Sequence, residues 1–410
     1  MSPEIPIKPA KRVAGILVAV IFIQTVLVEC CFILWPILPL LLIPNPRARK
    51  IFQLVAQWGQ ASWLGLAVTC LRFVSGTRIY IHTKGKMNLE EMQQIPGDLL
   101  MISNHPSRID WMFLWSVAIA LGRLPGLKIV LKDSLRKAPG FGWAMQCNAY
   151  PFVCRKDRNA DLQTVRRVSS LAGENQGMAM LLFPEGSDLS DANVERSHAF
   201  SEKENLEKYM QVLHPRSAGF ETACASMMEV AEKKHAEKPS LLDITVAYVH
   251  HIPGELPSEV KFFGKGECVQ EVHLLLQEVP LNQSDAAKQC NKLWKEKEDM
   301  LSKFYAPCQR DGRRSGSGQE PDRSALAAES STLWEEVPGA KGRIAASLTV
   351  AFVCEIIALY LLMTLPFLLT SVLFASACAT FVAIQKFAGG VDKVILHHAD
   401  EYQPKSTKLD

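Results

Sequence analysis

Long apolar runs lie near both ends of the chain, and a region of alternating patterns lies between them. The first runs from Val13 to Ile43, and the second covers residues 345–384. A helix needs about 20 apolar residues to cross a bilayer, so each run is long enough for a span. A secretory signal would have a shorter apolar segment and a small-residue cleavage site, and the first run shows neither. Membrane helices are therefore expected at both ends.

The first apolar run is long for one membrane span and short for two. Pro36 and Pro39 interrupt its second half. Basic residues flank it on both sides, namely Lys8, Lys11, Arg12, Arg47, Arg49 and Lys50. The positive-inside rule then favours a hairpin that returns to its starting side, with a single tilted span as the alternative. Residues 1–50 are expected to form an N-terminal membrane anchor or hairpin, and 51–76 a helix on the membrane surface or against the domain.

The central region alternates strand-like and helix-like stretches. Short β-branched or apolar segments indicate strands at 78–82, 98–103, 126–131, 178–183, 243–248 and 271–276. Longer helical patterns lie between them, as at 110–121 and 161–172. This alternation predicts an α/β fold with a mixed, largely parallel sheet flanked by helices. The domain is expected to cover 77–306 and to end with a polar helix.

The chain changes character after residue 306. Residues 307–344 are rich in Gly, Ser and charged side chains and low in aromatic ones, which predicts a disordered linker. Residues 345–385 are apolar with Pro366 near the middle, which predicts a transmembrane hairpin with its turn at that proline. Residues 386–410 are expected to form a polar tail.

Composition supports a protein that is partly in lipid. Hydrophobic residues make up 48% of the 410 residues, and the mean hydropathy is slightly positive at +0.06. The net charge of +3 is too small to indicate a nucleic-acid partner. The 11 cysteines are scattered without paired spacing, which argues against a disulfide framework and against a zinc site. Free thiols indicate a reducing compartment, so the catalytic region is expected to face the cytosol.

The candidate chemistry begins directly after the strand at 98–103. There the chain reads Asn104-His105-Pro106-Ser107-Arg108-Ile109-Asp110, and a helical pattern follows. Pro106 keeps His105 out of helical geometry, so its imidazole can fold back toward Asp110 in the first helical turn. A carboxylate in that position fixes the imidazole tautomer and stabilises imidazolium, as a general base requires. The same spacing is also an ordinary helix capping box, which would explain Ser107 and Asp110 without catalysis.

Further polar residues follow other strands. Glu185 and Gly186 come after the strand at 178–183, and Arg155 follows the segment 150–154. Ligands of α/β sheets bind at the carboxyl ends of strands, which makes these residues candidates for a site. The alternatives are a plain turn at Glu185-Gly186 and a surface charge at Arg155.

Four sequence blocks occur in a characteristic order. They are NHPSRID at 104–110, YPFVCR at 150–155, FPEGS at 183–187 and DITVAYV at 243–249. In this order they resemble the glycerolipid acyltransferases, and LHPRSAGF at 213–220 is similar to the 1-acylglycerol-3-phosphate and lysocardiolipin acyltransferase branch. The resemblance covers about residues 77–280. One departure is Ser187, where that family usually has threonine, and the hydroxyl is retained.

The resemblance implies a role for each matching residue. His105 would be the general base and Asp110 its partner. The acceptor glycerol phosphate would be bound by Asn104, Lys132, Arg155, Glu185, Gly186 and Ser187. An arginine suits a phosphate through its planar fork of donors, and a lysine as a point charge.

The expected reaction transfers an acyl chain from acyl-CoA to the free hydroxyl of a lysophospholipid. Lysophosphatidic acid is the first choice of acceptor, and a lysocardiolipin or lysophosphatidylglycerol is the alternative. Acyl-CoA serves as co-substrate, and neither a cofactor nor a metal is expected, because the His–Asp pair lacks a third ligand at suitable spacing. Acyl-CoA, the lysophospholipid and membrane lipids are the expected partners, at the endoplasmic reticulum membrane. Three alternative functions belong to other classes of protein. They are a lipid hydrolase, a cysteine acyl-enzyme using Cys147 or Cys154, and a non-enzymatic membrane-shaping protein.

Overall fold

The computed structural model describes residues 9–73, 75–172, 177–249, 262, 269–310, 313–314, 320–326 and 330–401. Its centre is a seven-stranded sheet with the order β11-β1-β8-β7-β2-β6-β3. These strands are β1 (Arg78–Lys84), β2 (Leu99–Ser103), β3 (Leu127–Ile129), β6 (Ala179–Leu182), β7 (Ser240–Val249), β8 (Glu271–Val279) and β11 (Ser330–Leu333). Four neighbouring pairs are parallel, namely β1–β8, β7–β2, β2–β6 and β6–β3. The pairs β7–β8 and β1–β11 are antiparallel. The structure therefore confirms the mixed, largely parallel α/β sheet.

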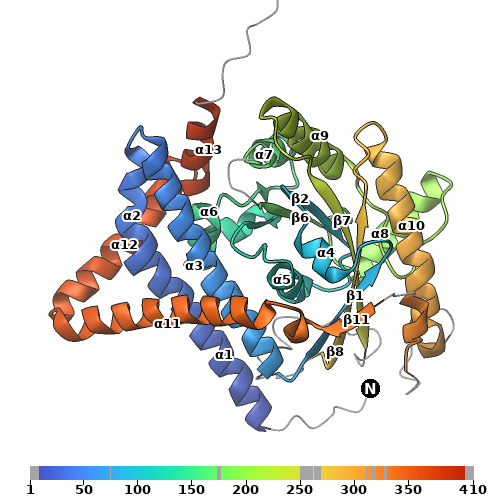
Figure 1. Cartoon of the computed structure of the whole chain (residues 1–410), viewed down its shortest axis with the longest axis horizontal. Coiled ribbons are helices and arrows are strands. Elements are labelled where there is room, and N and C mark those ends of the chain that lie inside the picture. Colours follow the sequence, from blue (N-terminus) through green and yellow to red (C-terminus); the bar gives the residue numbers. More distant parts are fainter. Residues whose placement is uncertain are drawn as a thin grey trace, which may run out of the picture.

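The sheet is covered by helices on its faces. They are α4 (Leu89–Gln93), α5 (Asp110–Ala120), α7 (Arg158–Ser169), α8 (Asp191–Lys203), α9 (Ala218–Lys233) and α10 (Ala286–Tyr305). Helix α5 packs against β1 and β8, while α10 packs against β7 beside α9. β2 and β6 are apolar and buried along their whole length, as expected for strands covered on both faces. Figure 1 shows this α/β body on one side of the molecule and the long apolar helices on the other.

A short second layer connects β3 to α7. It consists of β4 (Leu131–Lys132), the 3-10 turn η3 (Asp133–Lys137), α6 (Phe141–Cys147) and β5 (Phe152–Val153). β4 and β5 pair in parallel, with Lys132 opposite Val153. This layer places the residue after β5 near Lys132.

The N-terminal apolar run forms one helical rod. Its parts are α1 (Pro9–Val28), the π-helical segment η1 (Glu29–Leu34), α2 (Trp35–Ile37) and the 3-10 segment η2 (Leu38–Leu42). The hairpin expected inside this run is therefore wrong, because π and 3-10 turns accommodate Pro36 and Pro39 without reversing the chain. The reversal comes after Ile43, and α3 (Pro46–Phe73) runs back beside the rod (Figure 1).

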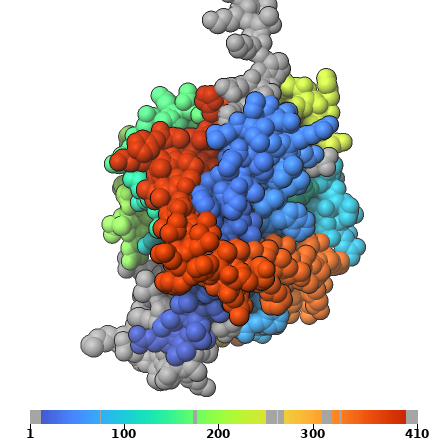
Figure 2. All heavy atoms as spheres, turned by 90° about the vertical axis from the view of Figure 1, so that its left-hand side faces the viewer, coloured from blue at the N-terminus to red at the C-terminus, as the bar shows by residue number. Residues whose placement is uncertain are grey.

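The C-terminal apolar run forms two helices joined at Pro366. They are α11 (Ala340–Thr364) and α12 (Phe367–Phe387). Within the described ranges, three segments are long and apolar enough to cross a membrane: Arg12–Leu42, Ala340–Thr364 and Phe367–Phe387. Large exposed apolar side chains gather on α1, α3, α11 and α12, and Figure 2 shows the face on which α3 (blue), α11 (orange) and α12 (red) lie together.

Part of the expected linker is folded into the domain. Residues 330–333 form β11, which extends the sheet beyond β1, and η7 (Trp334–Glu336) follows it. Trp334 is 1% exposed. The disorder expected for 307–344 is therefore wrong for residues 330–344, because pairing with β1 and burial of one tryptophan stabilise a segment of polar composition. It is also wrong for Arg323–Leu326, which form the 3-10 turn η6 against α10 and bury Leu326.

Part of the expected polar tail is also folded, because Val391–Glu401 form helix α13. Val391 and Leu396 are each 1% exposed, and Asp392 forms an ion pair of 2.5 Å with Arg136 of η3. The tail contains the apolar residues of one helical face, so α13 docks beside α6.

Candidate active site

The turn between β2 and α5 carries the candidate catalytic pair. The imidazole Nδ1 of His105 lies 2.9 Å from Oδ2 of Asp110, so the contact expected from the sequence is present. The ring of His105 stacks on Phe183 with a centroid distance of 4.3 Å. Nδ1–H of the neutral imidazole donates a hydrogen bond to Asp110. The lone pair then lies on Nε2, and this nitrogen can take a proton from a substrate.

Asp110 holds the turn before α5 as well as the imidazole. Its Oδ2 accepts the backbone N–H of Ser107 at 2.8 Å as well as the imidazole proton. Its Oδ1 accepts the hydroxyl proton of Tyr248 at the end of β7. The Asp110 side chain is completely buried. The capping box is only half formed, because Asp110 accepts the Ser107 N–H but the N-cap residue of α5 is Ile109, which has no side-chain cap.

The electrostatics of this pair favour a protonatable imidazole. Burial lowers the pKa of His105, but the hydrogen bond and charge of Asp110 outweigh it, and the net pKa lies above the ordinary value. Burial raises the pKa of Asp110, against the hydrogen bonds from His105 and Tyr248. Beside Asp110, the protonated imidazole of His105 is therefore more stable than that of an exposed histidine.

Glu185 is surrounded by donors from the protein itself. Its carboxylate accepts the backbone N–H of His105 and that of Leu213, each at 3.2 Å, and the indole N–H of Trp294 at 3.2 Å. The residue is 2% exposed, and burial raises its pKa to about 7. The sequence predicted that Glu185 contacts the acceptor, whereas the structure shows it joining the catalytic turn to the segment around Leu213.

Asn104 connects the catalytic turn to the neighbouring strand. Its side-chain amide donates to the carbonyl of Val246 at 3.1 Å, and its Oδ1 accepts the Val246 N–H at 2.8 Å. Asn104 is 1% exposed. Its side chain therefore makes the two hydrogen bonds to β7 that the backbone of one further β2 residue would make. These bonds fix the position at which the chain leaves the sheet, just before His105.

The predicted phosphate-binding residues lie at the surface. Lys132 is exposed at the end of β4, and Arg155 is exposed just after β5. Arg155 has a left-handed backbone with φ +61, and its N–H donates to the Asp161 carboxylate at 2.7 Å. A non-glycine residue in this conformation is costly and is often found at functional sites.

The FPEGS turn brings Gly186 next to a second arginine, Arg216. Gly186 has φ +71, and a Cβ there would lie 3.8 Å from Cδ of Arg216. Ser187 is half-buried in the following bend. The backbone N–H of Arg216 donates to the carbonyl of Pro184 at 2.8 Å, which holds the two segments together.

Sequence reasoning assigned no role to Tyr248, Trp294 and Arg216. Tyr248 lay inside the quoted fourth block and Arg216 inside LHPRSAGF, but no spacing rule connects either one to His105. Trp294 is an apolar-face residue of α10 by pattern, and only the fold brings its indole to Glu185. These partners are separated from the catalytic turn by 100 residues or more, as with Tyr248 and Asp110, 138 positions apart.

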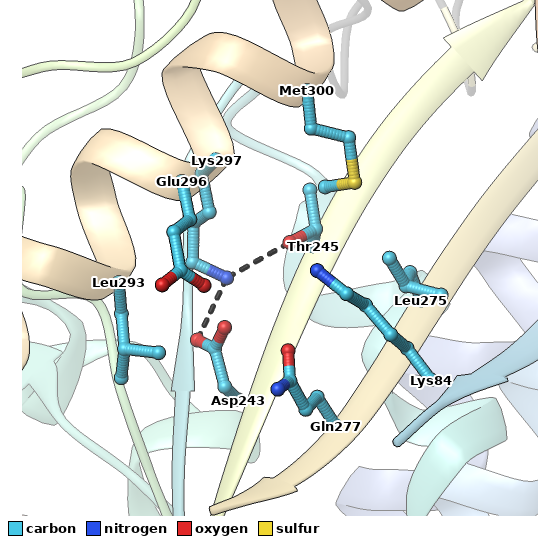
Figure 3. A pocket seen from close by; sticks show the side chains of 9 residues that line it. All are labelled: Lys84, Asp243, Thr245, Leu275, Gln277, Leu293, Glu296, Lys297 and Met300. Carbon is cyan, nitrogen blue, oxygen red and sulfur yellow. Dashed lines mark hydrogen bonds and ion pairs between the residues drawn. The ribbon is translucent and has the colours of Figure 1, made fainter. Parts of the chain in front are cut away.

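Helix α10 supports the site through buried polar contacts. Nζ of Lys297 lies 2.7 Å from Oδ1 of Asp243 and donates to Thr245 Oγ1 at 2.9 Å, and Figure 3 shows it pointing between these two β7 side chains. The adjoining cavity holds about 10 Å³, room for one water molecule and too little for a substrate. Lys297 is therefore a structural anchor of β7, the strand that carries Val246 and Tyr248.

The two cysteines considered as alternative nucleophiles lie in different settings. Cys147 is 2% exposed, and burial raises the pKa of its thiol, which disfavours the reactive thiolate. Cys154 is exposed beside Arg155, and its N–H donates to Asp161 at 2.7 Å.

Comparison with known proteins identifies related sequences. The profile of the family described as Acyltransferase matches residues 81–247. Lysocardiolipin acyltransferase 1 of Mus musculus is 35% identical over 280 residues, which cover 67% of this chain and 69% of that protein. Lysophosphatidylinositol acyltransferase 10 of Caenorhabditis elegans is 29% identical, with 60% of each chain covered. A probable 1-acyl-sn-glycerol-3-phosphate acyltransferase 5 of Arabidopsis thaliana is 27% identical, covering 60% of this chain and 62% of that one.

Proposed function

We propose, since this chain belongs to the glycerolipid acyltransferase family, that it transfers an acyl chain from acyl-CoA to the free hydroxyl of a lysophospholipid, with His105 as general base. The observation that carries this proposal is the 2.9 Å contact between His105 Nδ1 and Asp110 in the turn after β2. That contact orients Nε2 away from the carboxylate, toward the position a hydroxyl would take.

The proposed reaction is a direct transfer. Nε2 of His105 takes the proton of the acceptor hydroxyl while the oxygen attacks the thioester carbonyl. The carbon–sulfur bond then breaks, and the proton passes from the imidazolium to the departing thiolate, which leaves as CoA. Asp110 stabilises the imidazolium, and Tyr248 holds Asp110 through its other oxygen.

The proposed acceptor is lysophosphatidic acid, which would give phosphatidic acid. Lys132 and Arg155 support it, because both are cations at the ends of paired strands. A lysocardiolipin or lysophosphatidylglycerol acceptor is the second candidate, favoured by the name of the mouse relative. Glu185 and Asn104, which are buried and bonded within the protein, position the turn in this proposal.

The proposed setting is the endoplasmic reticulum membrane, with the catalytic domain facing the cytosol. Three apolar segments support attachment to a membrane. The free cysteines among the described residues are compatible with a reducing compartment.

A direct assay tests the activity. Membranes that contain the protein are incubated with oleoyl-CoA and a panel of lysolipids, and the products are resolved by mass spectrometry. We expect the diacyl phospholipid and free CoA, with the product lost in His105→Ala. Free oleate without an esterified product would indicate a hydrolase instead, and no turnover of any lipid would favour a membrane-shaping role.

A further inference from the structure

The segment from Phe183 to Leu189 holds the catalytic turn at three points. The carboxylate of Glu185 accepts the backbone N–H of His105 at 3.2 Å. The carbonyl of His105 accepts the backbone N–H of Leu189 at 3.1 Å. The third contact is the ring of Phe183, which stacks on the imidazole with a centroid distance of 4.3 Å and an interplanar angle of 27°. The first two contacts fix the backbone of His105, and the third acts on its side chain.

The order of the strands brings Phe183 to this position. Leu182, the last residue of β6, pairs with Ile102 of β2 in parallel register. The carboxyl ends of parallel neighbours meet at the same edge of a sheet, so Phe183 leaves β6 beside the turn that carries His105. The N–H of Gly186 donates to the Phe183 carbonyl at 2.9 Å, which closes the turn behind the ring. The sheet and this turn therefore determine where the ring lies.

The stacked ring completes the restraint of the imidazole. Nδ1 of His105 is held by Asp110 at 2.9 Å, but the terminal torsion of a histidine side chain is broad, so one hydrogen bond leaves the ring plane free to tilt. Stacking on Phe183 restricts that tilt and with it the direction in which Nε2 points. When the imidazole takes a proton it becomes a cation, and the face of an aromatic ring attracts a cation at this distance.

We propose that Phe183 is a positioning residue, which fixes the plane of the His105 imidazole and stabilises the imidazolium that forms during transfer. This inference rests on the proposed function and adds a residue to its mechanism. Phe183 acts through His105 and not on a substrate. Both of its effects are larger in the transition state than in the enzyme–substrate complex, so losing them lowers kcat and kcat/KM together and leaves KM unchanged.

Kinetics of ring-free and ring-bearing variants test this role. Phe183→Leu keeps an apolar side chain but removes the ring, and we expect kcat to fall about 2- to 30-fold, the range that cation–π contacts span. The KM for oleoyl-CoA and the KM for the lysolipid that the wild type esterifies should both stay unchanged. Phe183→Met, a second ring-free variant with an adaptable side chain, should show the same loss. Phe183→Tyr keeps the aromatic face and should retain most of the wild-type kcat.

The matched control is Phe200→Leu on α8. Phe200 also lies beside a histidine, with its ring centroid 5.8 Å from that of His214, and it is 47% exposed. This variant should keep the wild-type kcat. A wild-type kcat in Phe183→Leu would overturn the inference. A raised KM at unchanged kcat would overturn it too, because Phe183 would then contact a substrate, and so would equal losses of kcat in Phe183→Leu and Phe183→Tyr.

Chemical modification separates this inference from the proposed reaction. Diethyl pyrocarbonate acylates neutral imidazole, and mass spectrometry of the peptide that contains His105 gives the rate of modification. Because the Phe183 ring covers one face of this imidazole, the rate should rise several-fold in Phe183→Leu and stay at the wild-type value in Phe183→Tyr and Phe200→Leu. An inactive wild type that still shows this pattern would refute the acyltransferase proposal alone, whereas equal rates in all four proteins would refute the positioning role.

Discussion

At the scale of single residues, the site depends on carboxylates that each hold several donors. Asp110 accepts hydrogen bonds from His105, Ser107 and Tyr248. Glu185 accepts hydrogen bonds from His105, Leu213 and Trp294. Each buried acid therefore fixes parts of the chain that are distant in sequence. Burial still raises the pKa of both acids, so these donors offset only part of the cost of a buried charge, and removing one donor would leave more of that cost unbalanced.

The first prediction separates the two functions of Asp110. His105→Ala should lower turnover about 10²- to 10⁴-fold, the usual contribution of a positioned base, in a protein that still folds. Asp110→Asn should also lower turnover severely with near-normal Tm, because Asn can accept the Ser107 N–H but cannot stabilise imidazolium by charge. Turnover and thermal unfolding are measured together. Near wild-type turnover in Asp110→Asn would leave His105 without its proposed partner.

The second prediction concerns pH. The base must be neutral to accept a proton, so kcat/KM should fall as pH drops through the pKa of His105. Asp110 raises that pKa above its usual range, and the acid limb should therefore lie above about 6.5, the ordinary histidine value. Asp110→Asn removes the charge that raises it and leaves the burial that lowers it, so the residual activity should extend to lower pH. A limb that does not move would show that another group titrates.

Residue patterns predicted the centre of this site but not its surroundings. The contact between His105 and Asp110 followed from a strand, a proline turn and a five-residue separation, all of which are local. The positions of Tyr248, Trp294 and Arg216 depend on strand order and on the packing of α10, which no local spacing encodes. The roles of Lys132, Arg155, Gly186 and Ser187 stay predictions, although the structure places Gly186 near Arg216.

At the scale of elements, α10 acts as a support for three segments of the site. Trp294 bonds to Glu185, Lys297 to β7, and Glu298 to the backbone before Leu213. The Tyr305 hydroxyl accepts the N–H of Tyr248 at 2.9 Å. The sequence predicted a polar helix here. Several polar residues of α10 face the protein interior, and their presence made the composition of α10 resemble that of a fully solvated helix.

The third prediction tests this support through Glu298. Its two oxygens accept the backbone N–H groups of Met210, Gln211 and Val212 at 2.8–3.1 Å, and it is 5% exposed. Glu298→Gln replaces one oxygen by a donor that faces these N–H groups, so it should lower the free energy of unfolding by about 1–3 kcal/mol. Denaturant unfolding in detergent measures the loss.

The control for that prediction lies on the same helix. Glu296 is 42% exposed and forms a 3.9 Å surface ion pair with Lys292. Glu296→Gln should change stability by less than about 1 kcal/mol. Equal losses in the two variants would show that Glu298 has no special structural role.

Among the elements, the buried strands were the easiest to predict and the polar-looking segments the hardest. β2 and β6 are short apolar runs between turns, and both lie where the pattern placed them. β11 and α13 were missed because their stability comes from partners elsewhere, an edge of the sheet for β11 and an ion pair to Arg136 for α13. The composition of a segment gives its average polarity, but it does not show which other element of the fold the segment packs against.

At the scale of the whole molecule, helix α11 contacts the C-terminal end of the catalytic helix α5, and α3 contacts the segment that follows it. Arg343 of α11 donates to the carbonyl of Ile119 at 2.5 Å and to that of Ala120 at 2.6 Å. Gln60 of α3 donates to the carbonyls of Leu124, Pro125 and Leu127 at 2.9–3.2 Å. The last carbonyls of a helix have no partner within it, so a cation there stabilises the helix end. The apolar helix α11 and the catalytic turn are thereby connected through α5.

The last prediction tests that connection. Arg343→Ala should lower the free energy of unfolding by about 1.5–3 kcal/mol, because it removes charge-assisted bonds to buried carbonyls. Amide hydrogen exchange should quicken at the C-terminal end of α5, while the His105 turn at its other end keeps its protection. Lys341→Ala, at an exposed position two residues earlier, is the control and should leave both measurements unchanged. If Arg343→Ala behaves like Lys341→Ala, α11 is attached to the domain by apolar packing alone. If exchange quickens along the whole of α5, the helix depends on its membrane partner for its fold, and its orientation at the bilayer then also sets the position of the catalytic histidine.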